Sequence, residues 1–129
     1  ITKWAKIAFF GKKRSVASIK IATKDEINIL NKKFFKKDAA CNVLSFPHNS
    51  IVSSGEYILG DIIICADIVN KESVKYKINN DSRWAHMIIH SMLHLQGYTH
   101  QISEKRVIME EKEMILMDTL GYQNPYYAN

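Results

Sequence analysis

The sequence predicts a single α+β domain over residues 1–129, because it contains three short strand patterns and about five helical patterns. A chain of 129 residues has a usual length for one domain, and its hydrophobic content of 47% is enough for a core. No internal repeat and no stretch of linker composition divides the chain. We therefore expect one folding unit.

The first third of the chain predicts a helix, a strand and a second helix. Residues 2–11 have the pattern of a short helix closed by a glycine. Residues 16–22 alternate like a half-buried strand, with Ile21 among the inward-facing residues. The four residues Thr23 to Glu26 form a capping box that begins the next helix. The residues of that helix expected to face inward are Ile27, Leu30 and Phe34.

The middle of the chain predicts two strands separated by a loop. Residues 43–47 form a short strand pattern that ends at Pro47, and residues 48–57, rich in Ser, Gly and Asn, are expected to form the most mobile loop. Residues 59–65 are almost continuously apolar, which places them in the middle of the sheet. Asp61 within that run is interpreted either as a turn residue, which we prefer, or as a carboxylate that supports a metal ligand.

Three helices are expected in the second half of the chain. The first covers about residues 66–77. The second, over residues 82–96, is capped by residues 79–82 and is apolar nearly all round, as in a buried helix. Ser103 is expected to cap the last helix, which ends at Leu120 and Gly121.

The most informative motif lies at the end of the buried helix, where the sequence HSMLHLQGYTH contains His90, His94 and His100. On a helix, His90 and His94 lie one turn apart on the same face. Gly97 is a residue type that ends a helix in a left-handed conformation, so the chain turns back and His100 approaches the same point from a loop. Three imidazoles without an evident fourth ligand are typical of a catalytic zinc site, in which water fills the open position. We therefore predict one zinc ion per chain.

Ser91 argues against the function that this spacing first suggests. The pattern is that of the metzincin proteases, His-Glu-x-x-His-x-x-Gly-x-x-His, in which the glutamate after the first histidine is the general base. A serine hydroxyl cannot hold or pass protons near neutral pH as a carboxylate does. The zinc ligands are thus expected without the proteolytic base. A zinc peptidase therefore ranks third, behind the two functions considered below.

His86 continues the stripe of His90 and His94 along the same helix. A helix rises about 1.5 Å per residue, so His86 lies roughly 12 Å along the axis from His94, too far to share an ion. We interpret His86 as a residue that contacts a metal-binding side chain without binding the metal, or that packs in the core.

Positive charge is concentrated at the start of the chain. Residues 1–37 contain eleven Lys and Arg against two acidic residues, a net charge of +9, whereas residues 38–129 carry a net charge of −4. A positively charged segment joined to a segment with metal ligands suits a polyanionic substrate. The alternative is a lysine-rich surface that contacts only solvent. The lysines expected to contact such a substrate are Lys32, Lys33, Lys36 and Lys37.

Cysteine usage and hydropathy indicate the compartment. Cys41 and Cys65 are far apart and show no paired motif, so we interpret them as small apolar residues in a reducing environment. No apolar run approaches the length that spans a bilayer, and no signal peptide is visible. We expect a cytoplasmic protein without membrane association.

Four segments of the chain carry a family resemblance: Asn42-Val43-Leu44-Ser45-Phe46-Pro47, Leu59-Gly60-Asp61-Ile62, Trp84-Ala85-His86-Met87 with the His90–His100 motif, and Leu120-Gly121-Tyr122. Together they resemble the YbeY family of bacterial zinc-dependent endoribonucleases, in order from about residue 15 to the C-terminus. The resemblance implies a small mixed sheet surrounded by helices, zinc on His90, His94 and His100, and a cleft that faces a basic RNA-binding surface.

The same resemblance implies hydrolysis of single-stranded RNA in ribosomal RNA maturation and ribosome quality control. Zinc would lower the pKa of its bound water to about 7 and polarise a phosphoryl oxygen. No residue of the sequence stands out as the general base, and nothing in it identifies protein partners. The preference for RNA over DNA rests on the resemblance alone.

Phe35 is the departure from the family pattern that matters most for activity, because the family usually has an arginine there. Cys41, Ser91 and Thr99 stand where threonine, glycine and aspartate are usual, and the chain begins without the strand that normally precedes its first helix, which would leave a sheet edge to cover. Phenylalanine cannot stabilise charge in a transition state, so we expect reduced nuclease activity. The main alternative is a catalytically weak zinc protein associated with RNA or the ribosome.

Overall fold

A computed structural model describes residues 1–11 and 14–126, and this part of the chain confirms the α+β class with five helices and a three-stranded sheet. The strands are β1 (Ser15–Ala22), β2 (Val43–Ile51) and β3 (Tyr57–Cys65). The helices are α1 (Thr2–Ile7), α2 (Lys24–Phe35), α3 (Ala66–Lys75), α4 (Asn80–Leu95) and α5 (Ser103–Thr119). None of these described helices is long and apolar enough to cross a membrane.

β3 is the central strand of the sheet, as its apolar sequence predicted. It pairs in parallel with β1 and antiparallel with β2, which gives the order β1-β3-β2 and a mixed sheet. Leu59, Ile62 and Ile64 are buried in one core, and Ile63 and Cys65 are buried in another. Burial on both faces accounts for the nearly continuous apolar run.

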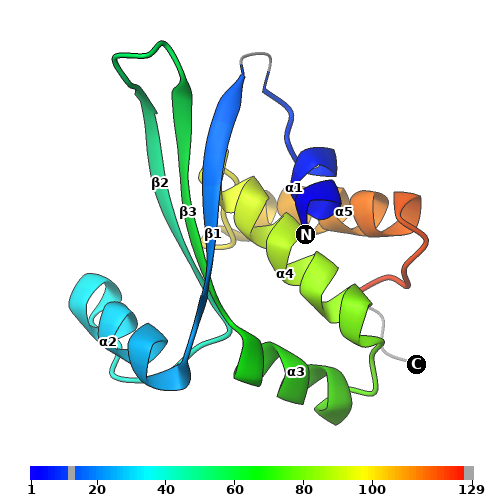
Figure 1. Ribbon diagram of the computed structural model, residues 1–129. Helices are drawn as coiled ribbons and strands as arrows, with labels where there is room; N and C mark the ends of the chain where they lie inside the picture. Colours follow the sequence, from blue (N-terminus) through cyan, green and yellow to red (C-terminus); the bar gives the residue numbers. More distant parts are fainter. Residues whose placement is uncertain (12–13, 127–129) are drawn as a thin grey trace.

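The two faces of the sheet carry different helices, as Figure 1 shows. α2 covers one face, where Ile27 packs in the smaller core with Leu44 and Ile63. α4 covers the other face and forms the larger core together with residues of α1 and α5. α4 therefore lies between the sheet and α5, and both neighbours fix its position.

β2 is longer than the sequence predicted. The expected strand ended at Pro47 and a loop was expected over residues 48–57, but β2 continues to Ile51 and forms a hairpin with β3. β2 is an edge strand, where proline is tolerated. The register also shifts between Pro47 and Ser50, where Asn49 adopts a φ of 50°. The expectations of a strand end at Pro47 and of a loop were therefore wrong.

The capping box before α2 was predicted correctly, whereas the end of α1 and the cap of α5 were not. The capping box is confirmed, because the Thr23 hydroxyl accepts from the Glu26 N–H while the Glu26 carboxylate accepts from the Thr23 N–H. α1 ends at Ile7 rather than at Gly11. Ser103 is not the cap of α5, since the N-cap is the preceding residue and makes no side-chain bond.

Two side chains expected to face the core are exposed. Ile21, near the end of the edge strand β1, is 49% exposed. Phe34, in the last turn of α2, is 54% exposed and packs edge-on against Phe46 with a centroid distance of 5.3 Å. Local periodicity correctly predicted the strand and the helix, but the ends of β1 and α2 extend past the residues that pack in the core.

Gly60 allows α4 to approach the sheet closely. A Cβ atom at this position would lie 2.4 Å from the carbonyl oxygen of Phe46 and 2.7 Å from the side chain of Leu95. Only glycine fits such a contact without displacing the backbone. The contact brings the C-terminal end of α4, with its histidines, against β3.

Candidate metal centre

α4 places three histidines along one side of a buried helix. Asn79 caps its first turn by accepting a hydrogen bond from the Ser82 N–H at 3.1 Å, as predicted. His86, His90 and His94 follow at four-residue intervals. His86 is buried, whereas His90 and His94 are half-buried, so the stripe runs from the core toward the surface.

A glycine turn returns the chain to this end of α4. Gly97 has a φ of 98°, in the left-handed region, as predicted. Its N–H donates to the His94 carbonyl at 3.0 Å, and the Tyr98 N–H donates to the Leu93 carbonyl at 3.1 Å. These bonds tie the turn to the helix, and the loop beyond it carries His100 back to the other two rings.

The three histidines predicted as metal ligands converge at this point. One ring nitrogen from each of His90, His94 and His100 lies within 4.8 Å of the others. The ring centroid of His90 is 4.6 Å from those of His94 and His100, which are themselves 5.4 Å apart. Zn–N bonds are about 2.0–2.1 Å long, so the nitrogens must lie closer together than this limit when they share an ion. The group could hold a metal ion.

Glu113 is the partner of His90 and was missed by sequence reasoning. Its side chain is fully buried, and its Oε1 lies 2.6 Å from Nδ1 of His90. With Nδ1 engaged in this hydrogen bond, Nε2 is the nitrogen of His90 that remains for a metal ion. A carboxylate behind a ligand histidine fixes the tautomer and orientation of the ring.

Glu113 also connects His90 to two further groups. Its Oε2 accepts from the Tyr126 hydroxyl and lies 3.4 Å from Nε2 of His86. Burial by itself would raise the pKa of Glu113, but hydrogen bonds from His86 and His90 outweigh it and hold that pKa well below its usual range. Burial and the adjacent carboxylate raise the pKa of Tyr126. Glu113 is thus ionised at neutral pH, and Tyr126 is a neutral donor.

Burial keeps the other histidines of this region neutral. Burial, together with the neighbouring His90 and His100, lowers the pKa of His94 to about 4. Burial is also the main cause that lowers the pKa values of His100 and His86. A neutral imidazole is the form that binds metal, because a protonated ring has no free lone pair. His94 and His100 therefore need no deprotonation at neutral pH to become ligands.

A cleft of about 510 Å³ opens at the three histidines. Phe35 from the end of α2 lines this cleft together with residues of β2 and residues 97–101. Phe35 also packs against Phe46, with a centroid distance of 5.6 Å. The position at which the family resemblance implies arginine therefore supplies an uncharged aromatic wall beside the histidines.

A second group of possible ligands, formed by His86, His90 and Glu113, also lies within 4.8 Å. His86 and Glu113 are buried and bonded to each other and to Tyr126, and neither lines the cleft. His90, His94 and His100 all line it. The cleft group is therefore the one whose three side chains all face a single open cleft.

Ser91 faces the core rather than the cleft. Its side chain is fully buried, and its hydroxyl has no hydrogen-bond partner among residues 1–11 and 14–126. The position that holds the general base in metzincins thus carries a hydroxyl directed away from the histidines.

Asp61 does not join the histidine cluster. It lies inside β3, so the expectation of a turn residue was wrong. Its carboxylate accepts from the Ser18 hydroxyl and lies 2.7 Å from Nε2 of His48. Because Ile62 and Ile64 pack in the core on the α4 side, the strand period of two places Asp61 on the face that α2 covers. The expected support for a metal ligand is thus not at Asp61.

The four lysines expected to contact RNA, Lys32, Lys33, Lys36 and Lys37, are exposed at the end of α2. The first of them pairs with Asp38 at 3.9 Å, and the second lies 5.3 Å from the ring centroid of Phe34. The third ends the helix in a left-handed conformation with a φ of 57°. Lys12 and Lys13, which contribute to the charge of residues 1–37, lie outside the described residues.

An α+β fold in which three imidazoles converge on an open cleft defines a class of protein with a candidate metal site that a substrate can reach. Comparison with known families narrows this class. Residues 3–121 match the family model described as Endoribonuclease YbeY. The chain belongs to the YbeY family.

Curated relatives cover nearly the whole chain. Endoribonuclease YbeY of Buchnera aphidicola subsp. Schizaphis graminum is 39% identical over 97% of this chain and 80% of its own length. The protein of the same name from Wigglesworthia glossinidia brevipalpis is 40% identical over 96% of this chain and 83% of its own. The solution structure of TM1509 from Thermotoga maritima matches with a TM-score of 0.53 over 97% of this chain and 85% of that chain. At 20% identity, that structure supports the fold alone.

Proposed function

We propose that this protein is a zinc-dependent endoribonuclease that hydrolyses single-stranded RNA in ribosomal RNA maturation and ribosome quality control in the cytoplasm. The observation that carries the proposal is the convergence of His90, His94 and His100 on an open cleft, in a chain whose relatives are named endoribonucleases. In this proposal, residues 1–129 form one metal-dependent hydrolase domain.

The donors of the site favour zinc over the hard divalent cations. Three neutral imidazoles suit zinc, whereas calcium and magnesium prefer oxygen ligands. The bond between Glu113 and Nδ1 of His90 is the arrangement that commonly supports a zinc-binding histidine. Imidazole also suits copper, nickel and iron, and elemental analysis distinguishes these from zinc.

The residues around the cleft have separate tasks. Zinc bound there acts as a Lewis acid toward a phosphoryl oxygen and lowers the pKa of water. His94 and His100 present neutral nitrogens, and Glu113 keeps Nε2 of His90 available for the ion. The lysines that follow α2 hold the RNA backbone as point charges.

Phe35 sets the expected level of activity. Its ring lines the cleft without a hydrogen-bond donor or a charge, so charge that develops on the phosphate lacks one electrostatic contact. The same observation favours the alternative function, a catalytically weak zinc protein that associates with RNA or the ribosome. We propose reduced nuclease activity rather than none.

Cleavage of a labelled single-stranded RNA tests the proposal against its alternatives. The purified protein is assayed for metal content and then incubated with the RNA, with and without a chelator, beside a casein control. We expect about one zinc per chain and chelator-sensitive cleavage of RNA alone. Zinc-dependent RNA binding without cleavage would support the alternative, and cleavage of casein would indicate a peptidase. Protein without metal would overturn the proposal.

A further inference from the structure

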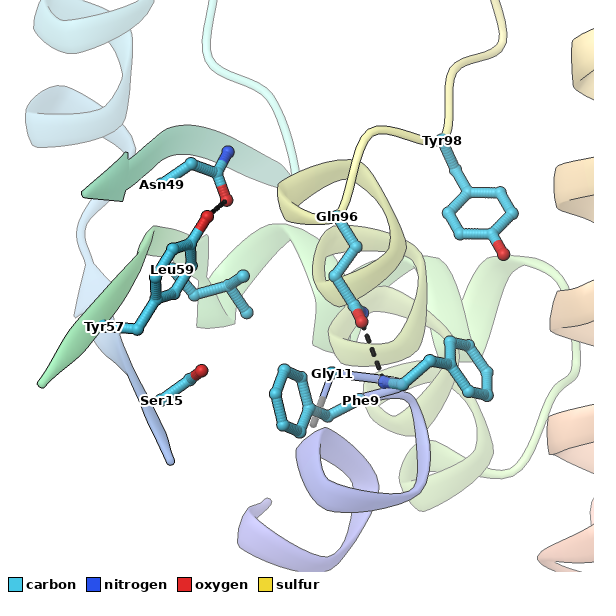
Figure 2. A pocket seen from close by; sticks show the side chains of 9 residues that line it. Phe9, Gly11, Ser15, Asn49, Tyr57, Leu59, Gln96 and Tyr98 are labelled. Carbon is cyan, nitrogen blue, oxygen red and sulfur yellow. Dashed lines mark hydrogen bonds between the residues drawn. The ribbon is translucent and has the colours of Figure 1, made fainter. Parts of the chain in front are cut away.

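A second pocket lies beside the metal centre, between the β2–β3 hairpin and the segment after α1 (Figure 2). Its volume of about 420 Å³ is within the range of roughly 300–1,000 Å³ that is typical of small-molecule sites. Four aromatic residues line it: Phe9, Phe10, Tyr57 and Tyr98. Phe10 is exposed and the other three are half-buried, so the pocket offers aromatic surface to a ligand.

Tyr98 joins this pocket to the cleft of the metal centre, because it lines both. It follows Gly97 in the turn that leads to His100. A chain molecule that extends from the histidines into the second pocket can therefore contact Tyr98 on its way. Lys112 of α5 holds its Nζ 4.7 Å from the ring centroid of Phe10 and 5.9 Å from that of Tyr98. The border between the two pockets thus carries a positive charge.

The side chains of Gln96, Asn49 and Tyr57 in the second pocket already bond within the protein. The Gln96 amide accepts from the Phe10 N–H at 2.8 Å and donates to two backbone carbonyls at 2.7 and 2.9 Å. The Tyr57 hydroxyl donates to Oδ1 of Asn49 at 2.9 Å. Figure 2 shows this bond and the bond between the Phe10 N–H and Gln96. These amides brace the walls, and the surface left to a ligand is mainly aromatic.

We propose that this pocket binds one nucleobase of the RNA strand whose phosphate lies at the metal centre. The proposal rests on the proposed endoribonuclease function. Single-stranded RNA is commonly bound by stacking of its bases on aromatic side chains, and stacking tolerates every base because each has a π-face. The pocket therefore fixes the position of the strand and does not select its sequence.

The position of the bound base relative to the cut bond follows from the shared residue. Because Tyr98 lines both the second pocket and the cleft, we place the bound base on a nucleotide close to the scissile phosphate. An apolar peptide side chain would also fit aromatic walls, but Lys112 at the border favours a ligand with phosphates.

Single-stranded RNAs that each lack one base test the proposal. An abasic ribose is moved along a labelled strand, binding to the zinc-loaded protein is measured by rapid mixing before cleavage, and the cut site is mapped on the same strand. In the wild type, one abasic position beside the cut site should weaken binding at least about fivefold, the lower limit for stacking on one aromatic side chain. Exchange of that base for another should have little effect.

Variants of the pocket should remove this position dependence. Tyr57→Ala and Phe10→Ala should each bind the intact strand more weakly and lose their sensitivity to the abasic position. Tyr57→Phe keeps the ring and should behave as the wild type. Tyr76→Ala removes an exposed tyrosine at the end of α3, outside the pocket, and is the matched control.

The outcomes separate this inference from the function on which it rests. Unchanged binding and an unchanged abasic profile in Tyr57→Ala and Phe10→Ala, with fold and zinc intact, would overturn the base pocket and leave the nuclease assignment in place. A wild-type protein that neither binds nor cleaves single-stranded RNA would overturn both. If Tyr57→Ala fails to fold, Phe10→Ala decides, because the side chain of Phe10 is 47% exposed.

Discussion

Two histidine–carboxylate pairs of nearly equal length lie on opposite faces of the sheet. His90 lies 2.6 Å from Glu113 on the α4 side, and His48 lies 2.7 Å from Asp61 on the α2 side. The Glu113 side chain is fully buried, whereas that of Asp61 is 41% exposed. Of these two histidines, only His90 belongs to a cluster of three converging imidazoles among the described residues. The surroundings of a pair, and not the distance between its two side chains, therefore distinguish a candidate metal centre from a surface histidine–carboxylate contact.

Burial changes what each pair contributes. A solvent-exposed ion pair stabilises a protein by about 0–1 kcal/mol, because water screens the charges. Removing one partner of a buried pair leaves an uncompensated group and costs about 3–5 kcal/mol. Glu113 therefore constrains the ring of His90 strongly, while His48 is free to rearrange at little cost. Metal binding should be sensitive to changes on the α4 face and insensitive to the same changes on the α2 face.

Replacement of His94 by Ala is expected to have the largest effect, the loss of bound zinc and of RNA cleavage, because it removes one of three ligands. His48→Ala should leave both unchanged. His86→Ala should largely keep the metal, since His86 does not line the cleft. Elemental analysis and cleavage rates measure these effects. Equal loss of zinc in the His94 and His86 variants would contradict the ligand assignment.

Phe35→Arg is expected to raise the rate of RNA cleavage by as much as about 10²–10³-fold, the range for one well-placed electrostatic contact in a transition state. A guanidinium can bind two phosphate oxygens at once and stays charged. Phe35→Leu is the matched control, because it removes the ring without adding charge. Single-turnover cleavage rates of the two variants and the wild type, compared at equal zinc content, test this expectation. A rate that does not rise would show that another group already supplies this contact.

Glu113→Gln is expected to lower zinc affinity by about 10–100-fold, since the amide keeps the volume of the side chain but loses the charge that orients His90. Asp61→Asn makes the same chemical change on the other face and should leave zinc affinity unchanged. Competition with a chromophoric chelator measures both affinities. Similar losses in the two variants would show that burial does not distinguish the two pairs.

Sequence reasoning found the converging histidines but missed Glu113, and the reason is physical. His90, His94 and Gly97 lie within two helical turns, so their spacing alone defines much of the geometry. Glu113 is 23 residues from His90, and only the packing of α5 on α4 brings the two together. One indication was present, because Glu113 shares the buried face of α5 with Met109, Leu116 and Met117. A carboxylate on such a face needs a buried partner.

The strands show the same limit of local information. Residues 59–65 were placed correctly in the middle of the sheet, because burial on both faces leaves a continuous apolar run. The continuation of β2 beyond Pro47 could not be read from the sequence, since it depends on pairing with β3 at an edge of the sheet. The position of Asp61 depends on the same pairing.

Reversal of Lys36 and Lys37 to Glu is expected to have the smallest effect, a uniform weakening of RNA binding at all sequences with zinc content unchanged. Each phosphate contact with a single strand contributes about 0.7 to the slope of log affinity against log salt concentration, so the loss of two contacts should lower the slope by about 1.4. The double reversal of Lys75 and Lys77, at the end of α3, makes the same change in net charge away from the end of α2. Titrations at several salt concentrations compare the two double variants. If both slopes fall equally, RNA responds to the overall charge of the protein. A fall confined to the Lys36 and Lys37 variant would place the RNA backbone at the end of α2, next to Phe35 and the cleft that it lines.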